Sequence, residues 1–217
     1  RMISVAFFRK FIRKVRGIIE FKEKTHAFDP SVLGLSNNIY LDGYWQSEKY
    51  FINNNKLIRS CFSLKNMQFK EERQKTLSEI IDSNSVSIHV RRGDYCLLPE
   101  VKIQHGLCSL NYYNQALEYL NQYEKTLHCF VFSDDIEWVK KNLKIKHKIT
   151  YIEGNSSEFD IFLMSNCKHN IIANSSFSWW AAWLNKNPSK IVVAPKQWFN
   201  NKNMSSSDIL PPKWIKL

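Results

Sequence analysis

The 217-residue chain lacks the features that define several protein classes. No apolar run reaches the length of about 18 residues that a membrane-spanning helix requires. The chain opens on Arg1-Met2 without a secretory leader pattern, so we expect a cytoplasmic protein. Its five cysteines are scattered and never spaced as C-x-x-C, which disfavours a disulfide framework and a zinc site. A disulfide between Cys96 and Cys108 is the weaker alternative. Six glycines and six prolines are too few for a fibrous or disordered chain.

Positive charge is abundant, and the chain carries a formal net charge of +11. Residues 1–25 hold eight basic side chains against two acidic ones, so this segment supplies a net +6. The remainder has no stripe of lysine and arginine interleaved with stacking aromatic rings, the pattern typical of nucleic-acid binding. We therefore expect no nucleic-acid partner. A nucleic-acid binder that depends on residues 1–25 is the weaker alternative.

Residues 2–21 have the periodicity of a basic amphipathic helix. Apolar side chains such as Phe8, Phe11 and Val15 recur at helical spacing, and arginines and lysines fill the other face. Two interpretations stay open. Either the helix packs on its own domain, or residues 1–25 make a peripheral contact with an anionic membrane at its inner face.

From residue 86 onward, short apolar strands alternate with helices. The expected strands cover residues 86–90, 128–132, 149–152, 170–173 and 191–194, and the expected helices cover 112–123, 136–143, 157–166 and 177–185. Before them, residues 65–82 and a segment that starts near Tyr44 also have helical patterns. Continuously apolar strands separated by helices predict parallel pairing with right-handed crossovers, and hence a doubly wound α/β domain of about five strands.

Polar clusters follow three of these strands. They are residues 89–94 after the first strand, 133–135 after the second and 174–177 after the fourth. Sheets of this kind bind ligands beyond the carboxyl ends of their strands. We therefore expect the three clusters to meet at one edge of the sheet.

Two of the clusters have groups suited to an anionic ligand. The guanidinium of Arg91 or Arg92 can chelate two phosphate oxygens, and Asp94 can hold an arginine in place. The stretch Asn174-Ser175-Ser176 offers backbone N–H groups at a helix N-terminus, which favours an anion.

Other readings of the acidic and histidine residues stay open. Asp134 or Asp135 can accept hydrogen bonds from a nucleoside, or can simply cap the helix that begins at Ile136. His89, on an apolar strand, can also be an ordinary core histidine. Without a D-x-D motif or a second carboxylate cluster, we expect no metal.

Three stretches together resemble the bacterial α-1,2-fucosyltransferases of glycosyltransferase family 11. They are residues 88–95 (IHVRRGDY), 132–138 (FSDDIEW) and 164–184 (MSNCKHNIIANSSFSWWAAWL), and weaker similarity covers 40–51 and 105–108. The resemblance implies a GT-B-like enzyme with two Rossmann-type domains. It also implies GDP-β-L-fucose as donor, inversion at the anomeric carbon, a galactose-terminated glycan as acceptor, and no cofactor or metal.

The resemblance also implies roles for individual residues. Arg92 would bind the β-phosphate, and His89 and one of the two adjacent aspartates would contact the guanosine. The expected catalytic residues are Arg92, His89 and Asp94. The expected donor-binding residues are His89, Arg91, Arg92, Asp94, Asp134, Asp135, Asn174, Ser175, Ser176 and Phe177.

One departure from the family pattern concerns the N-terminal part. Family members usually open with a glycine-rich strand–turn–helix segment that this sequence does not contain. We therefore expect residues 1–85 to form an incomplete N-terminal, acceptor-side domain and residues 86–217 to form the GDP-sugar-binding domain. His105 is the candidate general base. Binding of a GDP-sugar without turnover, or transfer with a different linkage, are the alternatives.

Overall fold

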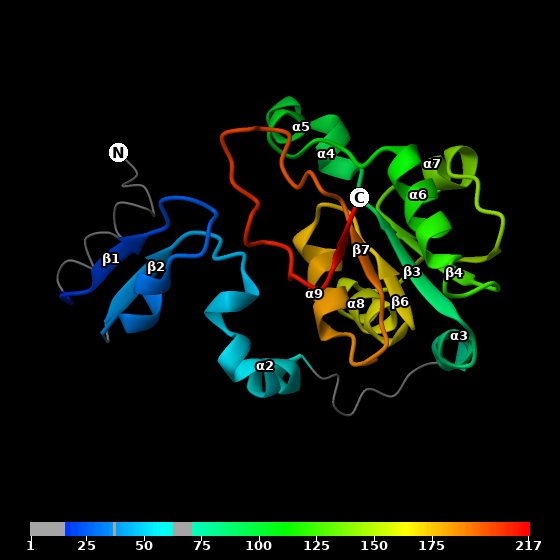
Figure 1. Cartoon of the computed structure of the whole chain (residues 1–217), viewed down its shortest axis with the longest axis horizontal. Helices are drawn as coiled ribbons and strands as arrows, with labels where there is room; N and C mark the ends of the chain where they lie inside the picture. Colours follow the sequence, from blue (N-terminus) through cyan, green and yellow to red (C-terminus); the bar gives the residue numbers. More distant parts are fainter. Residues whose placement is uncertain (1–15, 37, 63–70) are drawn as a thin grey trace, which may run out of the picture. The chain divides into compact units, whose positions relative to one another are not determined.

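The computed structural model describes residues 16–36, 38–62 and 71–217. They divide into two compact units, which are described separately (Figure 1). The smaller unit contains the described residues up to Asn53 together with Met204–Pro211. The larger unit contains Asn54–Asn203 and Pro212–Leu217, so it begins earlier than the boundary expected at residues 85 and 86.

The smaller unit contains a two-stranded parallel sheet formed by β1 (Ile19–Lys22) and β2 (Ile39–Asp42). The expectation of a helix over residues 2–21 is therefore wrong at its end, and residues 2–15 lie outside the described part. Gly17 has a φ of +62°, a left-handed conformation that ends any helix passing through it. The β-branched Ile19 then favours the extended backbone of β1.

Two short 3-10 turns, η2 (Glu48–Tyr50) and η3 (Ile52–Asn54), stand where a helix was expected from Tyr44 onward. A further 3-10 turn, η1 (Pro30–Gly34), lies earlier in the chain. Trp45 has a φ of +52°, which excludes a regular helix there.

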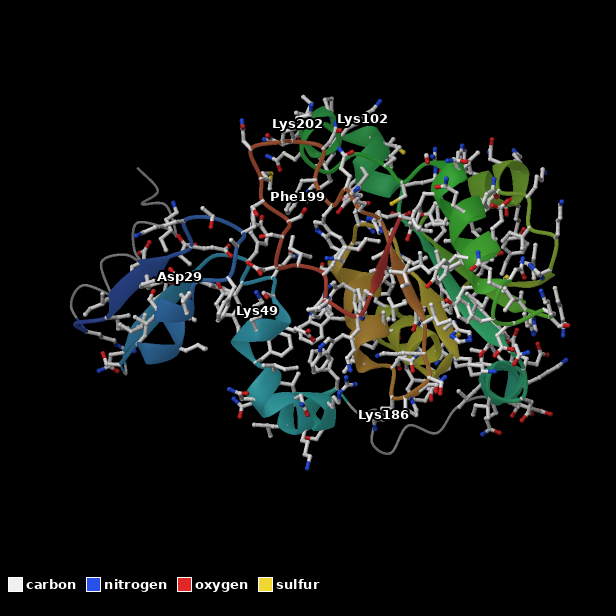
Figure 2. All side chains as sticks on the ribbon, viewed as in Figure 1. Asp29, Lys49, Lys102, Lys186, Phe199 and Lys202 are labelled. Carbon is white, nitrogen blue, oxygen red and sulfur yellow. The ribbon has the colours of Figure 1, made fainter. Side chains whose placement is uncertain are left out.

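Carboxylates hold the loops of the smaller unit together. Glu23 accepts hydrogen bonds from the backbone N–H groups of Tyr44 and Trp45. Asp208 accepts one from the backbone of Phe28 at 2.9 Å and forms an ion pair with Lys49, which is labelled in Figure 2. The segment Met204–Pro211 is thus tied to residues about 180 positions earlier in the chain.

The larger unit is built on a six-stranded parallel sheet with the order β5-β4-β3-β6-β7-β8. The strands are β3 (Ser85–Val90), β4 (His128–Ser133), β5 (Lys148–Ile152), β6 (His169–Ile171), β7 (Val192–Ala194) and β8 (Ile215–Lys216). The doubly wound α/β fold predicted from the sequence is confirmed. Counted from β3, the order is 3-2-1-4-5-6, that of dinucleotide-binding domains. The order reverses between β3 and β6, so the switch point lies beyond their carboxyl ends.

The helices of the larger unit are α2 (Asn55–Cys61), α3 (Glu71–Ile81), α4 (Gly93–Leu97), α5 (Pro99–His105), α6 (Leu110–Leu120), α7 (Ile136–Asn142), α8 (Ser157–Asn166) and α9 (Ser176–Leu184). Of these, α6 and α7 pack on one face of the sheet, and α3, α8 and α9 pack on the other. The side chains of β4 alternate between two cores. Val131 packs with α6 and α7 on one face, whereas Phe130 and Phe132 pack with α3, α8 and α9 on the other. Among the described residues, no helix is both long and apolar enough to cross a membrane.

Candidate functional site

The three polar clusters predicted from the sequence meet at the carboxyl edge of the large sheet. The backbone N–H of Arg92, after β3, donates to Asp134 Oδ1, after β4, at 2.8 Å. The Tyr95 hydroxyl donates to the carbonyl of Asn174 at 3.2 Å. The rings of His89 and Phe177 lie 5.4 Å apart. The prediction that the clusters converge is thus confirmed, and they converge at the switch point.

Arg91 is held by carboxylates on both of its terminal nitrogens. Its Nη2 lies 2.7 Å from Asp94 Oδ1, and its Nη1 lies 3.1 Å from Asp134 Oδ2. Its guanidinium also lies 5.4 Å from the centre of the Tyr95 ring. Because both terminal nitrogens already have acidic partners, Arg91 acts in this structure as a brace between the ends of β3 and β4.

Arg92 is held differently, and its outer edge stays available. Its Nε donates to Asp135 Oδ2 at 3.0 Å, and its guanidinium carbon lies 3.5 Å from the centre of the Trp138 ring. Within the described part of the chain, its two Nη nitrogens have no partner. This side chain is only 18% exposed, so the group is fixed in place while a pair of parallel donors remains free.

Trp138 is a site residue that the sequence analysis missed. It stands in the FSDDIEW stretch, three positions after Asp135, which is the N-cap of α7. The Asp135 carboxylate accepts from the Trp138 backbone N–H at 3.3 Å and also binds Arg92. One carboxylate therefore fixes both the arginine and the ring that supports it. The spacing between an N-cap and the first helical turn was the available signal.

The two adjacent aspartates serve the arginines. Asp134 uses one oxygen for the Arg92 backbone and the other for Arg91, while Asp135 both caps α7 and pairs with Arg92. The capping interpretation of Asp135 is therefore confirmed. A Cβ atom on Gly93 would lie 2.5 Å from Asp134 Oδ2, so any larger residue there would have to displace this carboxylate from Arg91 and the Arg92 backbone.

His89 is buried on β3, with only 4% of its surface exposed. Burial, helped by the positive charge of Arg91, lowers the pKa of its imidazole to about 3, so the ring is neutral at pH 7. Its Nδ1 is a buried atom with no hydrogen-bond partner among the described residues. His89 is therefore not a satisfied core histidine, and a neutral ring beside Phe177 can hydrogen-bond a ligand but not act as a general acid.

The segment after β6 has two structural roles: Asn174 ties neighbouring loops together, and Ser175 begins the helix α9. The Asn174 side chain is buried and donates to the carbonyls of His105, at 2.8 Å, and Trp198, at 3.1 Å. Ser175 is the N-cap of the nine-residue helix α9, and its side chain makes no capping hydrogen bond. The first backbone N–H groups of α9 therefore lie at the switch point as potential anion donors.

His105, the cysteines and possible metal ligands remain to be placed in the structure. The ring of His105 lies between those of Tyr95, at 5.0 Å, and Phe199, at 5.5 Å. All five cysteines are free thiols. Across the described residues, no group of three or more His, Cys, Asp or Glu side chains could hold a metal ion.

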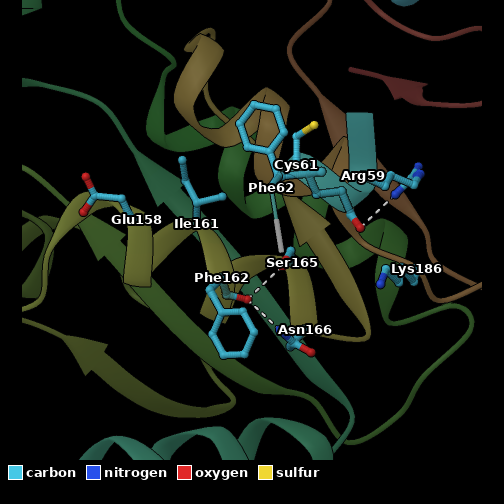
Figure 3. A pocket seen from close by; sticks show the side chains of 10 residues that line it. Arg59, Cys61, Phe62, Glu158, Ile161, Phe162, Ser165, Asn166 and Lys186 are labelled. Carbon is cyan, nitrogen blue, oxygen red and sulfur yellow. Dashed lines mark hydrogen bonds between the residues drawn. The ribbon is translucent and has the colours of Figure 1, made fainter. Parts of the chain in front are cut away.

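A hollow of about 440 Å³ lies apart from this edge and contains none of the predicted site residues (Figure 3). Its walls include Phe62, Ile161 and Phe162, and the side chains of Ser165 and Asn166 both donate to the Phe162 carbonyl. Ser165 and Asn166 thus bond within the helix α8 itself, and none of the residues expected at the site lines this hollow.

Comparison with known proteins agrees with the resemblance. The profile of Glycosyl transferase family 11 matches residues 14–217. The alpha-1,2-colitosyltransferase of Escherichia coli is 42% identical over 188 residues, 84% of this chain and 64% of the relative. The O-antigen biosynthesis glycosyltransferase WbnK of Escherichia coli is 42% identical over 142 residues, 63% of this chain and 45% of the relative. The galactoside alpha-(1,2)-fucosyltransferase 1 of Bos taurus is 27% identical over 155 residues, 66% of this chain and 43% of the relative.

The chain thus spans between 45% and 64% of the length of the two bacterial relatives. A solved structure, the NodZ alpha-1,6-fucosyltransferase soaked with GDP-fucose, aligns with a TM-score of 0.42 and 16% identity, over 84% of this chain and 60% of its own. The profile match covers nearly the whole sequence, with substantial identity to two bacterial members, and so the chain belongs to glycosyl transferase family 11.

Proposed function

We propose that the chain transfers L-fucose from GDP-β-L-fucose to the 2-hydroxyl of a terminal galactose, with inversion at the anomeric carbon. The acceptor is a glycan of the O-antigen or capsule type. The observation that carries this proposal is Arg92, which is fixed by Asp135 and Trp138 with both Nη donors free at the switch point of the sheet. Family membership and the 42% identity to an alpha-1,2-colitosyltransferase and to an O-antigen biosynthesis glycosyltransferase support it.

Arg92 would act on the leaving group. The 2-hydroxyl oxygen of galactose attacks the anomeric carbon as the bond to the β-phosphate breaks, and GDP departs with the bonding electrons. Negative charge therefore grows on the β-phosphate in the transition state, where a preorganised guanidinium stabilises it most. The N-terminus of α9 adds backbone donors at the same edge. The hydroxyl proton leaves to a base, for which His105 is the candidate.

The neighbouring side chains would complete the donor site. His89 would contact the guanosine, supported by its unpartnered Nδ1, and Asp135 would offer a second acceptor at the end of β4. Asp94 would act through Arg91, which it holds at 2.7 Å. Ser176 and Phe177, on the first turn of α9, would border the phosphates and the nucleoside.

A second donor is favoured by one specific finding. The colitosyltransferase of Escherichia coli is 42% identical over 84% of this chain. Colitose is fucose without its 3-hydroxyl, so GDP-colitose presents the same diphosphate to Arg92 and differs only in the sugar. Parallel assays with the two donors decide between them, since a site that hydrogen-bonds the 3-hydroxyl discriminates strongly against a donor that lacks it.

Substitution of Arg92 tests the proposal directly. Arg92→Ala removes two charge-assisted hydrogen bonds to phosphate, each worth about 1.5–3 kcal/mol, so GDP affinity should fall by at least about 100-fold and transfer should vanish. Arg92→Lys keeps the positive charge but loses the two parallel N–H donors of the guanidinium, so most of the transfer activity should be lost. Arg73→Ala is the matched control, because Arg73 also lies over an aromatic ring, that of Phe159, but on α3. Near-normal kinetics in both Arg92 variants would end the proposal.

Two further assays separate the alternatives. Product analysis after incubation of GDP-fucose with lactose and with N-acetyllactosamine reports the linkage. Calorimetry with GDP, combined with a GDP-release assay, identifies a chain that binds the donor without turnover. This outcome deserves its own assay because the chain spans only part of its relatives' length.

We also propose that residues 1–25, with their net charge of +6, hold the protein at the inner, anionic face of a membrane. Cosedimentation with vesicles that contain phosphatidylglycerol should decline as salt is raised, and should be lost when residues 1–15 are deleted. Equal binding to neutral vesicles would contradict an electrostatic contact.

A further inference from the structure

A second cavity, of about 280 Å³, lies at the carboxyl ends of β6 and β7 within the larger unit. Its lining includes His105, Cys108, Asn174, Gln197 and Asn200. No Asp, Glu, Lys or Arg is found among the described residues that line it. The volume lies just below the range of about 300–1,000 Å³ that is usual for drug-sized ligands, so it suits one small ring rather than a nucleotide.

The walls of this cavity are fixed by hydrogen bonds. The Asn174 amide donates to the carbonyls of His105 and Trp198, and the Cys108 thiol donates to Asn174 Oδ1 at 3.5 Å. Asn200, which also lines the cavity, donates its backbone N–H to the Gln104 carbonyl at 2.8 Å. A buried side chain that holds three segments together makes a preformed site rather than an accidental gap.

The polar groups that remain suit a neutral ligand rich in hydroxyl groups. The Gln197 amide nitrogen donates to Asn200 Oδ1 at 3.3 Å. Gln197 Oε1 and Asn200 Nδ2 then have no partner within the described part of the chain, so the exposed pair presents one acceptor and one donor. Ser109 accepts from the Tyr112 backbone and keeps its own hydroxyl proton to donate. Uncharged donors and acceptors of this kind match sugar hydroxyls.

The cavity also adjoins the arginine site. Asn174, which forms one wall, accepts from the Tyr95 hydroxyl and directly precedes the N-cap of α9. In the sheet the strands lie in the order β4, β3, β6, β7. The aspartate pair follows β4, the arginine pair follows β3 and the helix α9 follows β6, whereas the cavity extends to the end of β7. A ligand in the cavity therefore lies one strand beyond the proposed pyrophosphate position, on the side away from β4.

We propose that this cavity binds a single neutral sugar ring of the reactants, through the amides of Gln197 and Asn200. The inference rests on the proposed function, which supplies two such rings, the acceptor galactose and the transferred 6-deoxy sugar. Both have the chemistry that the cavity recognises, and the experiment distinguishes them.

Two substitutions of one exposed residue alter the cavity. Gln197→Ala removes half of the amide pair, and Gln197→Trp fills the volume. Gln122→Trp is the control, because Gln122 is exposed in the turn before β4, at the opposite edge of the sheet. The measurements are GDP affinity by calorimetry, saturation-transfer NMR with lactose and with L-fucose, and the KM values for lactose and GDP-fucose.

Wild type and Gln122→Trp should bind at least one of the two sugars. Gln197→Ala should weaken that binding by about 3- to 10-fold, the effect of losing one neutral hydrogen bond. Gln197→Trp should abolish it, and GDP affinity should be unchanged in all four proteins. An effect confined to lactose identifies the acceptor ring, and one confined to L-fucose and GDP-fucose identifies the transferred sugar.

Undiminished sugar binding by Gln197→Trp, no sugar binding by the wild type, or a loss of GDP affinity in the Gln197 variants would each overturn the inference. A wild-type chain that binds no GDP would instead contradict the proposed function, and the sugar titrations would still decide the role of the cavity.

Discussion

Removal of the Trp138 ring should weaken GDP binding indirectly, because the ring supports the Arg92 guanidinium that is proposed to bind the diphosphate. The ring centre lies 3.5 Å from the Arg92 guanidinium carbon, and the Arg92 side chain is 18% exposed. A cation–π contact is worth about 0.5–1 kcal/mol at exposed sites and about 2 kcal/mol when desolvated. For this mostly buried pair we expect about 1–2 kcal/mol, which corresponds to about a 5- to 30-fold rise in the Kd for GDP in Trp138→Ala.

The assay is calorimetric titration with GDP, accompanied by thermal melts that verify folding. Trp138→Phe keeps an aromatic face and should lose less than about fivefold. Tyr151→Ala is the matched control. Tyr151 lies on β5, and the centre of its ring is 5.6 Å from the ammonium of Lys140, which is on α7 like Trp138. This substitution removes a similar contact away from the arginines, so its GDP affinity should match that of the wild type.

The reasoning would be refuted by a folded Trp138→Ala protein that binds GDP as tightly as the wild type. In that case Asp135 alone would suffice to orient Arg92. Equal losses in Trp138→Ala and Tyr151→Ala would also count against it, since they would show a general loosening of α7 and not the loss of a specific support.

Three further predictions concern the same unit. Gly93→Ala should displace Asp134 and weaken GDP binding by about tenfold or more, whereas Gly34→Ala, where a Cβ meets nothing within 4 Å, should not; calorimetry compares them. Burial raises the pKa of Asp160 to about 6, so ionisation of this carboxyl lowers the stability of the fold as pH rises from 3.8 through 6. Asp160→Asn should therefore raise the urea midpoint at pH 7.5, by an amount that shrinks towards pH 4. A gain that stays constant with pH would show that the ionisation of Asp160 is not the cause. The pKa of His89 is lowered to about 3, so the stability of the fold falls as pH drops below 6.5, where the unfolded chain takes up a proton that the buried ring cannot. His89→Gln should remove about 2 kcal/mol of the stability loss between pH 6.5 and 5.0. If urea titrations give the same dependence of stability on pH in this variant, the loss belongs to other groups.

The sheet could be predicted from the sequence because its strands carry a strong local signal. Segments such as 128–132 are continuously apolar, and the observed β4 (His128–Ser133) agrees within one residue. The position of the ligand edge followed from the general rule for parallel sheets. β8 (Ile215–Lys216) was missed because a two-residue strand has no periodicity to detect.

The N-terminal region shows where local patterns fail. Apolar residues around Ile19 fit a helical period, but Gly17 adopts a positive φ and Ile19 pairs with Ile39 of β2. That pairing joins residues 20 positions apart, so no window of helical length contains the information. The helix α4, which starts at Gly93, was not predicted because its five residues are too few to show a helical period.

Arg91 and Arg92 are adjacent in the sequence and carry the same guanidinium group, so only the approach of β4 to β3 gives them different roles. A phosphate near the terminal nitrogens of Arg91 would meet the carboxylates of Asp94 and Asp134, which already lie 2.7 and 3.1 Å from those atoms. At Arg92 the nearest carboxylate, Asp135, occupies the Nε side and leaves the Nη pair open. For the proposed GDP-sugar donor, repulsion at one arginine and attraction at the other would direct the diphosphate to Arg92. The three aspartates would then select which of the two arginines the diphosphate reaches.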